Sequence, residues 1–290
     1  MTTWQIFTSA WEWEPSIVVG CVALLVGYLA ALRFRPTKAA LWFAGGLLVL
    51  LLALVSPLDT LGDTYLFSAH MVQHLLLVLI VPPLLLLGIP PSLAERALQW
   101  PLAGRAERVL GQPLVAWLVG IVAIWVWHAP ALYNAALNSE AIHIAEHLCF
   151  LVSATIFWWP VLMPLPGRRL APLATLLYIV PAAMANTLLG ILLAYSPLGL
   201  YPAYLSPEDT LGILPLLRDS WGLSPKADQQ LAGLLMWVPG GLVYLAALLG
   251  VLARWFGSPE TDEEYGEATP VDPDTAGATI APHRRRPHVS

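Results

Sequence analysis

The chain has 290 residues and a formal net charge of −5, and 58% of its residues are hydrophobic while only 11% are charged. Soluble domains contain about 45–50% apolar and about 25% charged residues, so this composition, with several apolar runs of about 20 residues, predicts an integral membrane protein. Nucleic-acid binding is not expected, because the only basic run is the short segment 284–286.

Apolar runs between prolines, glycines and charged residues predict an all-α integral membrane protein, a seven-transmembrane-helix bundle. Helices are expected because backbone groups in lipid must be hydrogen-bonded within the segment. Residues 1–256 would form the transmembrane domain, with an uncleaved N-terminus, and the acidic segment 257–290 would be a disordered cytoplasmic tail. The predicted spans are about 16–34, 39–56, 68–89, 113–131, 142–162, 172–195 and 229–254.

The basic residues predict how the bundle is oriented in the membrane. Twelve of the fourteen Lys and Arg residues lie in the tail and in loops on one side of the predicted bundle, and only Arg218 and Lys226 lie on the other. The positive-inside rule therefore places the N-terminus outside and the C-terminus in the cytoplasm. On the cytoplasmic side, residues 92–110 suit a short interfacial helix. On the outer side, residues 196–228 could fold over the helix ends as a lid.

Five of the seven histidines fall at the outer ends of three predicted spans. His70 and His74 share one helix face, as do His143 and His147, because residues four positions apart are neighbours on a helix. Ionisable residues inside a membrane mark functional sites by default, and paired histidines on facing helices are typical of metal sites in bundles. We expect the metal ligands to be His70, His74, His128, His143, His147 and Glu146.

Other polar or sulfur-containing side chains have weaker claims. Gln73 and Asp228 are expected to orient imidazole N–H groups. Met236, about two turns into the last span, is an auxiliary position, although a methionine there is most simply core or lipid-facing. Cys21 is at a similar depth but is better explained as a small buried hydrophobe, and Cys149 points away from the histidines.

Four motifs follow one another along the chain: segments 67–76, 127–133 and 228–237, and, before the last of these, the pattern His143-x-x-Glu146-His147. Together they resemble the CtaG-type, multi-span family of cytochrome c oxidase assembly factors. The resemblance covers about residues 15–255 and implies a non-enzymatic role in maturing the copper centre of a haem–copper oxidase. It implies copper as the bound metal, the five histidines as metal-site residues, and a bacterial plasma membrane as the location. Oxidase subunits, an extracytoplasmic copper chaperone and membrane lipid would be the partners.

Two other functions remain open from the residues themselves. The pattern His143-x-x-Glu146-His147 matches the H-x-x-E-H signature of zinc hydrolases, in which Glu146 would act as a base on zinc-bound water. A histidine pair across two helices could instead bind haem. Retained zinc with amidase or protease activity would identify the first, and a Soret absorption band the second.

Overall fold

The structure is a computed structural model that describes residues 3–35 and 37–257. Within these residues all regular structure is helical. The predicted disordered tail lies outside the described residues from position 258 onward. In chain order the elements are α1 (Thr3–Ser9), α2 (Pro15–Ala31), α3 (Lys38–Val55), α4 (Pro57–Thr60), η1 (Leu61–Tyr65), α5 (Phe67–Leu75), η2 (Leu76–Ile80), α6 (Val81–Leu87), α7 (Pro91–Leu98), α8 (Pro101–Leu110), α9 (Pro113–Trp127), α10 (Pro130–Leu137), α11 (Glu140–Leu162), η3 (Pro166–Arg168), α12 (Pro172–Tyr195), η4 (Pro202–Tyr204), η5 (Leu216–Ser220) and α13 (Pro225–Phe256).

Five helical segments are long and apolar enough to cross a membrane: α3, α5 with its continuation through α6, α11, α12 and α13. The helix α9 meets the same test only together with α8, from which it is bent by 80°. The apolar helix α2 has 17 residues and falls below the test. The chain is thus an all-helical, multi-pass membrane protein with five or six candidate spans. The count of seven spans and the orientation of the termini stay predictions.

Proline determines where many of the helices begin. Pro15, Pro113 and Pro172 each stand at the start of a helix, where the missing N–H has no partner in the helix anyway. The residue before a proline is disfavoured from continuing a helix. Trp100 is extended for this reason, and the segment 92–110 forms two helices, α7 and α8, instead of the single interfacial helix that we predicted.

Prolines also lie inside the spans, where neighbouring helices supply replacement hydrogen bonds. A proline within a helix removes one N–H donor and disturbs the preceding turn. In each case below, a side chain of a neighbouring helix donates a hydrogen bond to the backbone carbonyl three or four residues before the proline. This bond gives the carbonyl a partner where water is absent, and it also joins the two helices. The donors and acceptors are Trp158 Nε1 to Val78 O (3.0 Å) before Pro82, Tyr178 Oη to Phe157 O (2.7 Å) before Pro160, Trp117 Nε1 to Tyr178 O (3.1 Å) before Pro181, and Asn186 Nδ2 to Met236 O (2.7 Å) before Pro239.

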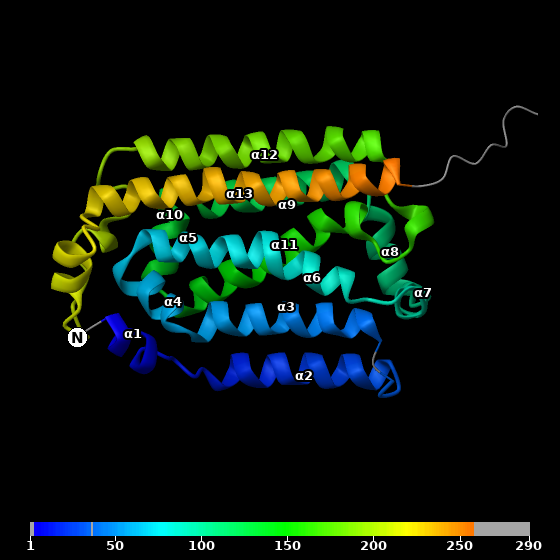
Figure 1. Cartoon of the computed structure of the whole chain (residues 1–290), viewed down its shortest axis with the longest axis horizontal. Coiled ribbons are helices and arrows are strands. Elements are labelled where there is room, and N and C mark those ends of the chain that lie inside the picture. Colours follow the sequence, from blue (N-terminus) through cyan, green and yellow to red (C-terminus); the bar gives the residue numbers. More distant parts are fainter. Residues whose placement is uncertain (1–2, 36, 258–290) are drawn as a thin grey trace, which may run out of the picture. The chain divides into compact units, whose positions relative to one another are not determined.

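The long helices run side by side (Figure 1). Helix α3 packs on α2 and α6, and α11 packs on α6 and α9. The helices α12 and α13 approach each other through two glycines: a Cβ on Gly190 would lie 2.7 Å from the carbonyl oxygen of Gly233, and a Cβ on Gly233 would lie 2.6 Å from the backbone nitrogen of Ala194. Small residues allow this close approach in a membrane, where van der Waals packing drives helix association.

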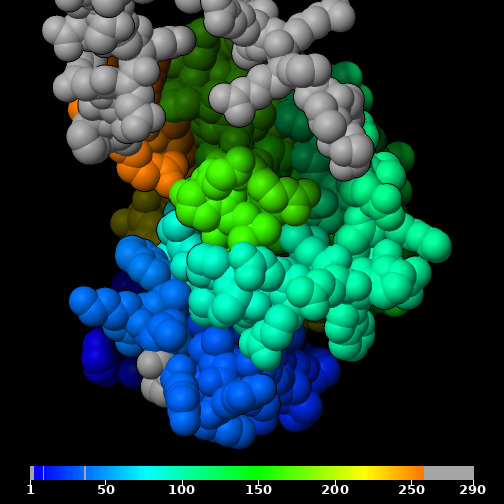
Figure 2. Space-filling model, turned by 90° about the vertical axis from the view of Figure 1, so that its right-hand side faces the viewer, coloured from blue at the N-terminus to red at the C-terminus, as the bar shows by residue number. Residues whose placement is uncertain are grey.

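The two ends of the helical bundle carry different elements. Helices α7 and α8 lie at one end, and Figure 2 shows them in teal beside the green turn that follows α11. Arg168 in that turn forms an ion pair with Glu107 of α8 at 2.9 Å. The first turns of α5, α11 and α13 lie at the opposite end, together with η1 and α10 (Figure 1). The helix ends that carry the histidines therefore meet at one end of the bundle.

Candidate metal centre

The start of α5 is held in place by Asp228 of α13. Leu66 is extended, so the chain enters α5 at Phe67 with free backbone N–H groups. The Asp228 carboxylate accepts hydrogen bonds from the N–H of Phe67 at 2.9 Å and of Ser68 at 3.0 Å, and also from the Ser68 hydroxyl. A negative charge at this position also complements the helix dipole. Asp228 thus anchors a helix, whereas we expected it to orient an imidazole.

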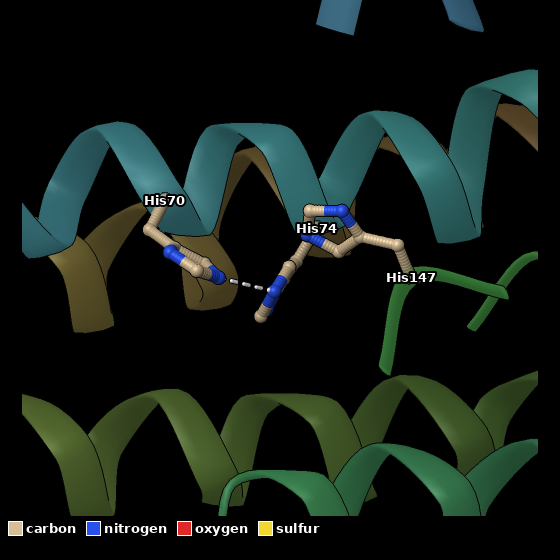
Figure 3. A group of neighbouring side chains, drawn as sticks. All are labelled: His70, His74 and His147. Atoms are coloured by element: carbon tan, nitrogen blue, oxygen red, sulfur yellow. Dashed lines mark hydrogen bonds between the residues drawn. The ribbon is translucent and has the colours of Figure 1, made fainter. Parts of the chain in front are cut away.

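Three histidines form the centre of the cluster. His70 and His74 lie one turn apart on α5, and their Nε2 atoms are 2.7 Å apart. His147 comes from α11, with its ring centroid 5.9 Å from that of His70 and 5.7 Å from that of His74. One nitrogen from each of the three rings lies within 4.8 Å of the others. Figure 3 shows the His70 and His74 rings pointing toward each other, with His147 alongside.

The other two predicted histidines flank this trio. The centroid of His128, at the end of α9, is 5.4 Å from that of His74, and its Nδ1 donates to the carbonyl of Ile124 at 2.7 Å. The centroid of His143 is 4.2 Å from that of His147. Met236 lines a small cavity with His74 and His128. The structure therefore brings together all five histidines that we singled out, with the auxiliary methionine at the edge of the cluster.

Glu146 is fully buried beside the trio. One of its carboxylate oxygens lies 3.8 Å from Nε2 of His74, and the side chain is 0% exposed. Neither oxygen has a hydrogen-bond partner. Buried polar atoms are nearly always partnered, and each that is not costs about 1–3 kcal/mol. The described residues contain eight such atoms: Asp63 Oδ1, Gln73 Oε1, His74 Nδ1, His128 Nε2, His143 Nε2, both oxygens of Glu146 and His147 Nε2.

Seven of these eight atoms belong to the histidines, Glu146 and Asp63, which adjoin one another, and their chemistry fits a metal ion. Imidazole nitrogens and carboxylate oxygens are ligands for copper, zinc and iron. Gln73 has a different role from the one we expected, because its Nε2 donates to the carbonyl of Ala53 at 2.9 Å and to the carboxylate of Asp59 at 2.5 Å. It ties α5 to α3 and α4, and no hydrogen bond joins it to an imidazole in the described part of the chain.

Asp63, which the sequence analysis did not select, adjoins the histidine cluster. It lies on η1, immediately before α5, with one oxygen 3.9 Å from Nδ1 of His70 and the other 3.5 Å from Nδ1 of His143. Burial raises the pKa of Asp63 to about 8, and the carboxylates of Asp59, Glu12 and Glu146 act in the same direction. A nearby cation would favour the ionised carboxylate.

Two tyrosines from the segment after α12 also adjoin the cluster. The Tyr204 hydroxyl donates to the carbonyl of Gly62 at 2.8 Å and lies 3.1 Å from Nδ1 of His70. The Tyr201 hydroxyl donates to the carbonyl of His128 at 2.7 Å. Both tyrosine side chains are buried. Part of the segment predicted as a lid therefore packs directly on the histidines, through aromatic residues that no local motif marks.

Neither cysteine belongs to a group of potential metal ligands among the described residues. Cys21 packs in a separate apolar cluster with Leu47 and Leu50, as expected for a small hydrophobe. Cys149 is a free, half-buried thiol.

Comparison with known proteins identifies relatives of this chain. An uncharacterized protein of Mycobacterium bovis and one of Mycobacterium tuberculosis are each 24% identical over 272 residues, which cover 85% of this chain and 39% of the relative. An uncharacterized protein of Mycobacterium leprae is 22% identical over 293 residues, covering 92% of this chain and 43% of the relative. The chain thus spans about two-fifths of the length of these relatives. No solved structure matches it.

A family match covers most of the chain. Residues 23–258 match the model of the family described as cytochrome c oxidase caa3 assembly factor (Caa3_CtaG). The matched region includes every histidine of the cluster and all the long helices. The chain belongs to the Caa3_CtaG family of cytochrome c oxidase assembly factors.

Proposed function

We propose that this chain binds copper at the histidine cluster and assists in maturing the copper centre of a haem–copper oxidase. The observation that carries the proposal is the group of buried, unpartnered nitrogen and oxygen atoms on α5, α9 and α11. Membership of a cytochrome c oxidase assembly family supports copper as the proposed ion. His70, His74 and His147 would be the central ligands, with His128, His143 and Glu146 close enough to join or replace them.

The geometry of the trio suits an ion that enters and leaves. Two imidazole nitrogens on one tetrahedral ion lie about 3.3 Å apart when the metal–nitrogen bonds are about 2.0 Å. The Nε2 atoms of His70 and His74 are 2.7 Å apart, so binding requires a small separation of the rings. Met236 beside His74 offers a soft thioether, a ligand type that favours Cu(I). More potential ligands than one ion needs would allow stepwise exchange during delivery.

The proposed topology places the cluster where an oxidase could receive copper. With seven spans, including α2 and α9, and with the basic loops in the cytoplasm, the histidine end of the bundle faces the outer side of a bacterial plasma membrane. Copper would come from an extracytoplasmic chaperone and pass to an oxidase subunit in the same bilayer. Cysteine labelling of Glu140→Cys from outside intact cells tests this topology, since the side chain is exposed at the histidine end. Labelling only after the cells are opened would contradict it.

Copper titration of the purified protein in detergent tests the binding site directly. We expect one tightly bound copper ion per chain, and a loss of about a hundredfold or more in affinity in the double variant His74→Ala/His147→Ala. Met184→Ala is the matched control, because this methionine is 66% exposed and is not among the proposed ligands. Unchanged affinity in the double variant would overturn the proposal. Retained zinc with hydrolase activity, or a Soret band, would support the two rival functions instead.

The cellular role needs a separate measurement. In cells that lack the native protein, the wild-type chain should restore caa3-type oxidase activity and the copper content of the oxidase. The double variant should be inserted at a normal level but restore neither. Full restoration by the double variant would separate oxidase assembly from the histidine cluster and refute the role of copper binding in it.

A further inference from the structure

We infer that the chain has a second, outer metal position, formed by Asp63, His143 and His70, through which an ion reaches the buried trio. This inference rests on the proposed function, because it supplies the route by which the proposed site is loaded. One ligand atom from each of the three residues lies within 4.8 Å of the others. The group therefore satisfies the same geometric requirement as the inner trio while sharing only His70 with it.

The contacts of Asp63 define the outer position. Its two oxygens point to different histidines, at 3.9 Å from Nδ1 of His70 and at 3.5 Å from Nδ1 of His143. Both distances are too long for hydrogen bonds. Oδ1 of Asp63, the oxygen that faces His70, is moreover buried without a partner. An ion bound between the three side chains would be coordinated by the Asp63 carboxylate and by one nitrogen of each imidazole.

Exposure falls from the outer position to the inner one. The side chain of Asp63 is 35% exposed and that of His143 is 15% exposed. The side chains of His70 and Glu146 are 0% exposed, and that of His74 is 3% exposed. An ion arriving from water therefore meets the Asp63 carboxylate first. It then reaches the trio by moving inward past His70.

His70 connects the two positions through opposite edges of one ring. Its Nδ1 faces Asp63, and its Nε2 faces His74. A neutral imidazole has one free lone pair at a time, so His70 ligates at one position and then at the other. The two positions are accordingly filled in turn. As one ion moves inward with its charge unchanged, the N–H proton of His70 changes from Nε2 to Nδ1, so the ring is neutral before and after the transfer.

A close backbone contact between η1 and α5 fixes the outer metal position next to the inner one. A Cβ on Gly62 would lie 3.0 Å from the backbone nitrogen of His70, so η1 rests directly on α5 at the residue before Asp63. The Tyr204 hydroxyl fastens this contact by donating to the Gly62 carbonyl at 2.8 Å. π-helical turns such as η1 occur frequently at functional sites. Here the turn η1 places the Asp63 carboxylate next to the imidazole of His70.

The ligand set of the outer position selects a class of ion. A carboxylate with two imidazoles suits divalent first-row ions, whose affinity for nitrogen and oxygen ligands is greatest at Cu²⁺. The inner trio offers nitrogen alone at its centre. Cu²⁺ is therefore the probe with which both positions can be observed, and electron paramagnetic resonance distinguishes oxygen-containing from all-nitrogen coordination.

Equilibrium binding of Cu²⁺ to the full chain separates this inference from the proposed function. We expect His74→Ala/His147→Ala to retain one weak Cu²⁺, with at least one oxygen ligand, and the addition of Asp63→Asn to abolish it. A double variant that binds no Cu²⁺, or whose weak ion survives Asp63→Asn, would overturn the outer position while leaving the proposed function intact. Absence of Cu²⁺ and Cu⁺ binding in the wild type would defeat the proposed function as well.

Loading kinetics test the route. Asp63→Asn alone should load Cu²⁺ about tenfold more slowly than the wild type, as followed by quenching of tryptophan fluorescence. Glu140→Gln is the matched control, because it removes an exposed carboxylate from the same end of the bundle without touching either position, and it should load at the wild-type rate. Loading of Asp63→Asn at the wild-type rate, or an equal slowing in both variants, would contradict entry through Asp63.

Discussion

Replacing Glu146 by leucine should make the ion-free protein more stable while weakening its hold on copper. The carboxyl group is 0% exposed, and both of its oxygens lack a hydrogen-bond partner. An unsatisfied buried polar group costs about 1–3 kcal/mol. Leucine fills similar space without that cost, so the free energy of unfolding should rise by about 2 kcal/mol. For a domain of roughly 250 residues this corresponds to an increase in Tm of about 6 °C.

Thermal unfolding in detergent, with and without copper, measures both effects. Loss of a group that contacts or orients a ligand typically lowers metal affinity by about 10–100-fold. A hundredfold loss removes about 2.7 kcal/mol of copper-induced stabilisation at a fixed copper concentration. Ser153→Ala is the control, because its hydroxyl lies two turns further along the same helix face and is bonded to the Phe150 carbonyl at 3.3 Å. A lower Tm for ion-free Glu146→Leu than for the wild type would refute the reasoning.

Three further variants test other contacts. Tyr204→Phe removes the hydroxyl next to the imidazole of His70 and should lower copper affinity about tenfold in a titration. Its control, Tyr195→Phe, changes an exposed tyrosine and should leave copper affinity unchanged. Gly233→Ala should lower the free energy of unfolding by about 1–3 kcal/mol, measured by thermal unfolding, because the new Cβ meets the backbone of α12. Its control, Gly241→Ala, has open space around the new Cβ and should raise the free energy of unfolding by up to about 1 kcal/mol. Asp228→Ala should lower both Tm and copper affinity, because it frees the first turn of α5; an unchanged affinity would show that the histidines do not depend on this anchor.

Much of the helical architecture follows from local features of the sequence. Apolar runs bounded by prolines, glycines or charged residues define α3, α11 and α12 within a few residues, because a proline at the edge of a run ends one helix or begins the next. The division of 92–110 into two helices has the same cause and could have been predicted from Pro101. The π-helical turn at Leu76–Ile80 could not, since it depends on prolines and on the tryptophan of another helix acting together.

The histidines could be found from sequence because imidazole is costly in a membrane, which makes each one conspicuous. Asp63 could not, since a carboxylate just outside a span is ordinary in an outer loop. Tyr204 comes from a segment without regular spacing, and its contact with His70 spans 134 positions. Asp228 was noticed, but its role as a helix anchor depends on the register between α5 and α13, which no local pattern specifies.

The link between Asp228 and the start of α5 has a consequence for biogenesis. The carboxylate and the N–H groups that it accepts are separated by 160 or more residues, so a ribosome-bound chain inserts α5 long before α13 exists. Until α13 arrives, the first turn of α5 has no anchor, and the two histidines that follow it are not held in place. On the proposed function, the nascent chain would therefore acquire its capacity to bind copper only when the last of the described helices has entered the bilayer.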